Sequence, residues 1–456
     1  MSSQMKNGKT MDMTEGSPLR LIVLFTIPII LGNIFQQLYN IGDAKVVSFF
    51  LNEHAFAAVG MTGVVSHTLL ALLSGFTQGL GILTANAFGA KSISRIRRYI
   101  AGSAILTAIL TLVLTVLIFI LIHPLLEWLN TPETLMEDAL SYIRVILLGT
   151  PFVALYNLSA NLLRSLGDSR TPLYCLIASI ILNLGLDLLF VGAFGWGIRG
   201  AAIATILSQA ICALACFLYG VTHFREYLPG REDWKVSRND YHELFLSGLS
   251  MGLMLFIVNV GTVILQGAIN SLGPDIMAAH TAGRRLIDIM MTFVYTIGVS
   301  MTTYVSQNYG AGRFDRIRKG VRVATVMVLL ESAVLILFAF LFARGIVTWI
   351  ASTDIVAIQD NATLYARVMV CFFPVLGPLF ILRCTLQGVG QKIIPLSSSI
   401  MEFFVKIVSA MWLTPWLGYL GVALTEPISW VLMLLLLLIG YIRWCVKSKH
   451  FSAEMQ

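Results

Sequence analysis

The amino-acid sequence predicts an all-α polytopic membrane protein with twelve transmembrane helices, arranged as two six-helix lobes that repeat each other. The first reason is composition, because 57% of the 456 residues are hydrophobic and only 12% are charged. Soluble proteins have about 25% charged residues. The second reason is a series of long apolar segments along the whole chain. The third is an internal duplication, in which motifs of the first half return in the second.

Each apolar segment is long enough to cross a bilayer, which takes about 20 mainly apolar residues in a helix. The approximate bounds of the twelve predicted spans are 19–48, 55–84, 99–122, 138–163, 172–194, 200–223, 243–270, 278–305, 320–343, 361–386, 394–414 and 421–443.

The duplication is clearest in the polar loops. Segment 88–98 begins Phe-Gly-Ala, ends in basic residues and returns as segment 309–319, at an offset of 221 residues. Gly167 and Pro172 return as Gly390 and Pro395, at an offset of 223 residues. Because six helices is an even number, both halves start on the same side of the membrane. The repeat is therefore a parallel pseudo-twofold, about an axis along the membrane normal.

The most polar stretch, 224–240, predicts the junction between the lobes. We expect an N-terminal tail at 1–18, an N-lobe with helices 1–6 at 19–228 and a linker at 229–242. A C-lobe with helices 7–12 at 243–443 and a C-terminal tail at 444–456 follow. Residues 1–18 lack the pattern of a signal peptide, so we expect the first span to be retained.

Lys and Arg gather in alternate loops, which sets the predicted orientation. The tails, the linker and the loops at 88–98 and 309–319 are basic, whereas residues 123–138 hold four acidic residues and no Lys or Arg. Both termini are therefore expected in the cytoplasm. This placement also accounts for the net charge of +7 without a nucleic-acid partner.

Polar residues inside the first-half spans predict a cation site. An acid near the bilayer centre costs about 2.5–3.5 kcal/mol, so it usually faces the bundle interior or water. Asn183 and Asp187 are four residues apart and share one helix face. The predicted ion-coupling residues are Asp43, Asn183, Asp187, Thr205 and Asn157. Burial favours a protonated carboxyl group, whereas the oxygens of Asp43, Asn183 and Asp187 would suit a sodium ion; a purely structural role for Asp187 is the alternative.

The charged residues of the second half form a different set. Glu402 and Lys406 are four residues apart and predict an ion pair, and Arg284 or Arg285 can pair with Asp288. The more isolated charges are Glu331, Arg367, Arg383 and Glu426. The interpretation of these residues as structural pairs stays beside the alternative that Glu402 and Lys406 bind substrate.

Prolines inside the predicted spans indicate bends. Pro28 lies in the first span, and Pro374 and Pro378 lie in the tenth. Proline removes a backbone donor and kinks a helix. A bend near Asp43 would link ion binding to movement, and a static kink is the alternative.

Several motifs together resemble the multidrug and toxic compound extrusion (MATE) family over nearly the whole chain. They are Gly32–Asn40 leading to Asp43, Ala57–Gly60, Gly167–Pro172, Asn183 with Asp187, Gly200–Thr205, Ser306–Ala311 and Leu386–Gly390. The resemblance implies a secondary transporter that exports cationic or amphipathic compounds in exchange for protons or sodium ions. It also implies a multi-pass protein of the bacterial plasma membrane. Protons are favoured over sodium because the seventh and tenth spans lack a central acid.

A substrate cavity is expected to include Gln36, Tyr39, Phe256, Lys406 and Glu402. The expected partners are small cationic or amphipathic molecules, protons or sodium ions and membrane lipids, with no cofactor and a monomeric state. A flippase for lipids or lipid-linked oligosaccharides is the first alternative, since Arg284, Arg285, Arg367 and Lys406 could line a basic cavity. A membrane-embedded enzyme is the second, but the chain has no HExxH, GxSxG or P-loop signature.

Overall fold

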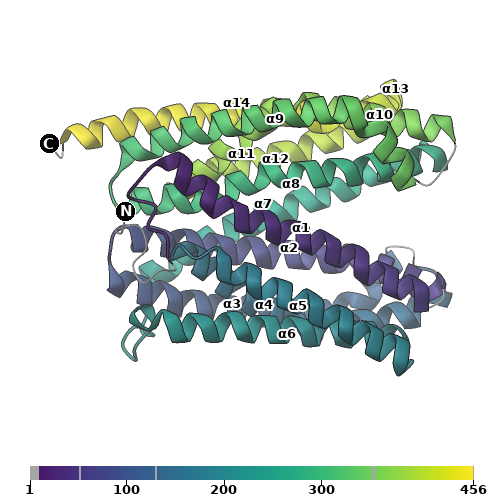
Figure 1. Cartoon of the computed structure of the whole chain (residues 1–456), viewed down its shortest axis with the longest axis horizontal. Helices are drawn as coiled ribbons and strands as arrows, with labels where there is room; N and C mark the ends of the chain where they lie inside the picture. Colours follow the sequence, from purple (N-terminus) through teal and green to yellow (C-terminus); the bar gives the residue numbers. More distant parts are fainter. Residues whose placement is uncertain (1–9, 51–52, 129–130, 352–354, 455–456) are drawn as a thin grey trace. The chain divides into compact units, whose positions relative to one another are not determined.

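The computed structural model describes residues 10–50, 53–128, 131–351 and 355–454, without the side chains of 40–48, 53–59, 61, 64, 128 and 449–454. Helices make up nearly all of this part (Figure 1). The helices of the first half are α1 (Pro18–Phe50), α2 (Glu53–Gly89), α3 (Ile93–Trp128), α4 (Glu133–Ser165), α5 (Arg170–Asp187) and α6 (Gly197–His223). The helices of the second half are α7 (Arg238–Asn270), α8 (Pro274–Gly310), α9 (Phe314–Ala351), α10 (Val356–Cys371), α11 (Phe373–Gly388), α12 (Ile393–Val408), α13 (Thr414–Leu417) and α14 (Tyr419–Glu454).

The described residues contain eleven helices long and apolar enough to cross a membrane, and twelve spans when the bent pair α10 and α11 is counted as one. The prediction of an all-α protein with twelve spans is therefore confirmed. The predicted spans were shorter than the observed helices, because the helices continue into polar turns. For example, α3 begins at Ile93 rather than at 99. Helix α7 likewise begins at Arg238, before the predicted start of the seventh span at 243.

Proline bends one span and leaves another continuous. The axes of α10 and α11 differ by 51° across a break at Phe372, so the predicted bend in the tenth span is confirmed. Pro374 lies in the first turn of α11, where its missing N–H is tolerated. Pro28 lies inside α1, which runs as one helix from Pro18 to Phe50.

Both halves interrupt their fifth span at the same place. A short π-helix, η2 (Leu188–Ala193), follows α5, and another, η4 (Ser409–Leu413), follows α12. Gly197 then has φ +62° and Gly418 has φ +59°, in the left-handed region that favours glycine. Single-turn π-bulges occur often at functional sites, and here they are part of the duplicated scaffold.

The chain forms two compact units by its internal contacts. The first comprises Ile27–Gly252 with the described residues of Met1–Met11, and the second comprises Asp12–Thr26 with Leu253–Gln456. The boundaries therefore fall inside α1 and α7. The lobe limits drawn from the sequence stay a prediction.

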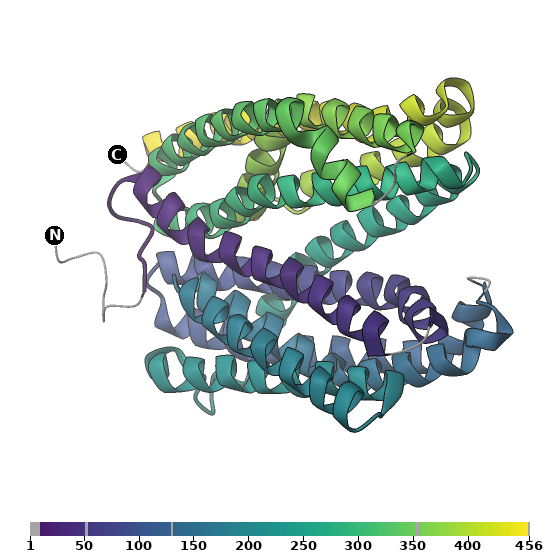
Figure 2. The ribbon, with the colours of Figure 1, turned by 45° about the vertical axis from the view of Figure 1, so that its right-hand side comes forward.

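In the first unit, α4 packs between α2 and α6 (Figure 2). Buried side chains of α2, α3 and α4, including Phe76, Tyr99 and Leu158, form its core. Helix α2 also lies very close to the first half of α7, because a Cβ atom at Gly79 would be 2.3 Å from the Ser247 carbonyl oxygen. The Ser247 hydroxyl donates to the Gly79 carbonyl at 2.7 Å.

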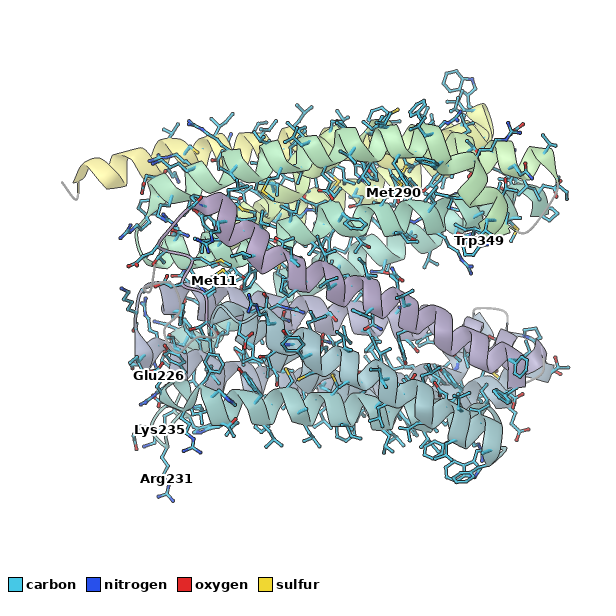
Figure 3. The ribbon with its side chains drawn as sticks, viewed as in Figure 1. Met11, Glu226, Arg231, Lys235, Met290 and Trp349 are labelled. Atoms are coloured by element: carbon cyan, nitrogen blue, oxygen red, sulfur yellow. The ribbon has the colours of Figure 1, made fainter. Side chains whose placement is uncertain are left out.

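The polar linker is attached to α3 at one end of the first unit, where Glu226, Arg231 and Lys235 lie (Figure 3). Arg97 Nε donates to the Glu226 carbonyl at 3.0 Å. Arg98 pairs with Asp240 at 3.5 Å. The 3₁₀ turn η3 (Arg225–Tyr227) and the first turn of α7 are thus held to the basic start of α3.

In the second unit, the segment before α1 packs on α8. The Met13 N–H donates to Gln307 Oε1 at 2.9 Å, and Asn308 Nδ2 donates to the Met13 carbonyl at 3.0 Å. Further along, the Thr26 hydroxyl donates to Ser300 Oγ at 2.7 Å. The first nine residues of α1 therefore belong to the second unit.

Candidate ion and substrate sites

The candidate ion site lies on α5 of the first unit. Asp168 closes the turn before this helix, because its carboxylate accepts hydrogen bonds from the N–H groups of Arg170 and Thr171, each at 3.0 Å. Asn183 and Asp187 follow near the other end of α5, and each is only 1% exposed. A polar pair on one face of a spanning helix is therefore enclosed by the unit.

Helix α6 brings Thr205 to the level of Asn183. The Ser179 hydroxyl of α5 donates to the Ser208 carbonyl of α6 at 3.0 Å, which fixes the register of the two helices. The two helices run in opposite directions. Asn183, one turn after Ser179 on α5, therefore lies level with Thr205, one turn before Ser208 on α6. The Thr205 hydroxyl donates to the Ala201 carbonyl in its own helix at 3.0 Å and keeps its oxygen lone pairs as acceptors.

The amide of Asn183 has an unsatisfied hydrogen-bond donor. Its Nδ2 atom is buried and has no hydrogen-bond partner among the residues that the structure describes. Buried polar groups almost always have a partner, so this N–H donor suggests an acceptor such as a water molecule. No group of three or more described His, Cys, Asp and Glu residues could hold a metal ion. A cation here would depend on amide and hydroxyl oxygens as well as carboxylates.

The other predicted ion-coupling residues lie on neighbouring helices. Asn157 is half-buried on α4, which packs on α6. Asp43 belongs to α1, and its side chain lies outside the described residues.

The predicted substrate residues belong to both units. Gln36 and Tyr39 are half-buried on α1, three residues apart on one face, in the first unit. Phe256 is half-buried on α7 in the second unit, which also contains Glu402 and Lys406.

The predicted pairing of Glu402 with Lys406 is confirmed. Lys406 Nζ lies 2.9 Å from Glu402 Oε1 and donates to the Thr262 hydroxyl of α7 at 3.0 Å. Their side chains are 9% and 2% exposed. Arg383 of α11 lies 3.9 Å from the other oxygen of Glu402. Substrate could contact these groups only if the pair opened.

The interpretation of Arg383 and Glu426 as isolated charges was wrong. Arg383 is part of the Glu402 pair, and Glu426 of α14 lies 2.6 Å from Arg284 of α8. Arg284 also pairs with Asp288 at 2.7 Å, as the spacing predicted. The pairing of Glu426 with Arg284 was missed because the two residues are 142 positions apart. The duplication contained a clue, because Glu426 follows Gly418 by the same eight residues that separate Thr205 from Gly197.

A family model described as MatE matches residues 28–189 and again residues 251–412. This chain belongs to the MatE family. The two matches start 223 residues apart and have equal lengths, so the duplicated half is itself the unit of the family. The predicted membership is confirmed, and the chain is a multi-pass membrane transporter.

Relatives and solved structures agree with this MatE assignment. The probable multidrug resistance protein YpnP of Bacillus subtilis (strain 168) is 27% identical over 432 residues, 93% of this chain and 94% of the relative. A FAD transporter of Shewanella oneidensis is 24% identical over 425 residues, 91% of this chain and 92% of the relative. A crystal structure of MATE in the bent conformation has a TM-score of 0.89 at 23% identity, over 97% of this chain and 98% of the other.

Proposed function

We propose that this MatE protein is a secondary active antiporter that exports cationic or amphipathic compounds in exchange for protons or sodium ions, by alternating access. The observation that carries the proposal is the enclosed pair of Asn183 and Asp187 on a membrane-spanning helix, level with Thr205. Relatives named multidrug resistance and multidrug export proteins support the efflux part.

The coupling chemistry follows from the low dielectric of the site. A buried ionised carboxylate needs a compensating positive charge, which a proton on Asp187 or a bound cation supplies. A sodium ion would take oxygens from Asp187, Asn183 and Thr205, with Asp43 and Asn157 as further ligands. Loading and emptying the site changes its charge, and a ligand that prefers one conformation shifts the population towards it.

Substrate binding is assigned to Gln36, Tyr39 and Phe256, which are half-buried and offer one amide and two aromatic faces. Aromatic rings attract organic cations. Glu402 and Lys406 stay candidates whose contribution would require their ion pair to open. In this proposal the protein acts as a monomer in the plasma membrane, with both termini in the cytoplasm.

Transport in proteoliposomes tests the proposal. We expect a fluorescent organic cation to move when an outward or inward gradient of pH or of sodium is imposed, and one of these ions to be sufficient. Asp187→Asn should abolish gradient-driven movement, because an amide can neither take up the proton nor supply the charge. Asp275→Asn, at an exposed acid in the first turn of α8, is the matched control and should transport normally. Full gradient-driven transport by folded Asp187→Asn would contradict the proposal.

The same vesicles distinguish the flippase. Arg284 and Lys406 are each in an ion pair, so two of the basic groups expected of a flippase cavity are already neutralised. Movement of a labelled lipid, without any gradient-driven movement of the dye, would favour the flippase over the antiporter.

A further inference from the structure

The second unit has Lys406 where the candidate ion site of the first has Asn183, and Ala410 where it has Asp187. The two family matches align Ser179 with Glu402 and Asn183 with Lys406. Two left-handed glycines mark the starts of α6 and α14: Gly197 is the first residue of α6, and Gly418 comes just before α14. Thr205 and Glu426 each follow their glycine by eight residues. The second unit therefore has two acids and an ammonium group where the first has two hydroxyls and an amide.

The Lys406 ammonium has the surroundings of a bound monovalent cation. Lys406 is 1% exposed, and its Nζ atom lies 2.9 Å from a Glu402 carboxylate oxygen and 3.0 Å from the Thr262 hydroxyl. Glu426 is within electrostatic range of the same ammonium. Carboxylate and hydroxyl oxygens are hard ligands that suit alkali cations as well as ammonium.

The charge balance of this region depends on Lys406. Ion pairs join Arg284 to Asp288 and Glu426, and join Glu402 to Arg383 and Lys406, so that three bases balance three acids. Removing the lysine charge leaves one negative charge in excess over these ion pairs, whose buried acids are Glu402 and Glu426. A buried charge without compensation is strongly destabilising, so the region would need another cation or a proton.

We propose that Lys406 is a tethered resident cation, which occupies a monovalent-cation site of the second unit formed by Glu402 and Thr262 with the charge of Glu426 nearby. The idea that the first unit binds and releases a cation rests on the proposed function, whereas the site of Lys406 itself does not. Because a tethered ammonium cannot be exchanged, cation exchange would be confined to the first unit.

Chemical replacement of the ammonium tests the proposal directly. Purified Lys406→Ala is unfolded by heat in sodium chloride, n-propylammonium chloride or choline chloride at equal ionic strength. Sodium or propylammonium should raise its Tm over the choline value by roughly 5 °C at saturation, since a ligand that binds only the folded state stabilises it. Wild type and Lys406→Arg, which keep a resident cation, measure the difference among the salts that arises at other sites, including the proposed ion and substrate sites. The double variant Lys406→Ala/Glu402→Gln, which removes both charges, should show no more than that background difference, whereas Lys406→Ala should exceed it.

A folded Lys406→Ala protein whose Tm differs among the three salts by no more than the background difference would overturn the proposal. So would stabilisation by acid alone, because that result would mean that a proton on a carboxylate replaces the lysine charge. If Lys406→Ala does not fold in choline, the yield of monodisperse protein extracted in propylammonium decides: rescue supports the site, and no rescue overturns it. These readouts need no transport, so a failure of the antiporter proposal would be seen separately in the vesicles.

Discussion

Arg284 joins two acids of very different exposure in the second unit. Its guanidinium donates to Glu426 on another helix at 2.6 Å and to Asp288 on its own helix at 2.7 Å. The Glu426 side chain is 7% exposed, whereas that of Asp288 is 44% exposed. Burial, rather than distance, separates the two contacts, since exposed pairs contribute little and broken buried pairs cost much.

Neutralising these two acids in turn should therefore give unequal effects. Glu426→Gln should destabilise the protein by about 3–5 kcal/mol, because it breaks a buried pair. Asp288→Asn, the matched control on the same arginine, should cost less than about 1 kcal/mol. Thermal unfolding of both variants in detergent measures the difference. Equal losses would show that the Arg284–Glu426 contact is no stronger than a surface pair.

The site residues differed in how far the sequence could predict them. Asn183 with Asp187 and Glu402 with Lys406 are one helical turn apart, so local spacing was enough to place each pair on one face. The Arg284–Glu426 pair joins residues 142 positions apart, and no local pattern encodes such a contact. That Thr205 lies level with Asn183 could not be predicted without the register between α5 and α6. The hydrogen bond from Ser179 to the Ser208 carbonyl fixes this register.

Among the helices, α2 and α7 make an unusually close contact that depends on glycine. A Cβ atom at Gly75 would lie 2.6 Å from the Met251 carbonyl oxygen, and one at Gly79 would lie 2.3 Å from that of Ser247. Both neighbours are backbone atoms, which cannot turn away as a side chain can. The two glycines are four residues apart on one face of α2, as in the small-residue contacts of membrane helices.

An added methyl group at this contact should separate the helices. Gly79→Ala is expected to destabilise the first unit by about 1–3 kcal/mol through overpacking and to lower the yield of folded protein. Gly185→Ala on α5 is the control, because its Cβ atom would meet nothing within 4 Å. Thermal unfolding and size-exclusion profiles of the two variants provide the comparison. Unchanged stability of Gly79→Ala would mean that α2 and α7 are free to move apart.

The sequence predicted the helices better than their ends and breaks. The number of spans follows from apolar length, and the bend before Pro374 follows from the missing backbone donor. Helix ends extend into polar turns, such as the basic start of α3, whose charged residues an apolar window excludes. The π-helical turns η2 and η4 were not predicted, because their residues are as apolar as the helices that they follow.

In the whole molecule, the duplication preserves the scaffold and changes the chemistry. The family model matches both halves, and the π-helical turns and left-handed glycines recur in both. The charged residues do not recur in both halves, since Lys406 stands in the place of Asn183. A parallel repeat has a further consequence, because every duplicated loop must lie on the same side of the membrane as its copy.

Cysteine labelling tests that consequence together with the orientation. In a transport-competent background with the six natural cysteines replaced, we would place single cysteines at the duplicated, exposed positions Ser94 and Asp315 and at Arg231 in the linker. An impermeant maleimide should label all three only after the cells are permeabilised, because basic loops stay in the cytoplasm. Ser271→Cys, exposed between α7 and α8, should react in intact cells. An inverted repeat would instead expose Ser94→Cys and Asp315→Cys on opposite sides, and labelling of Arg231→Cys in intact cells would reverse the orientation while leaving the repeat parallel.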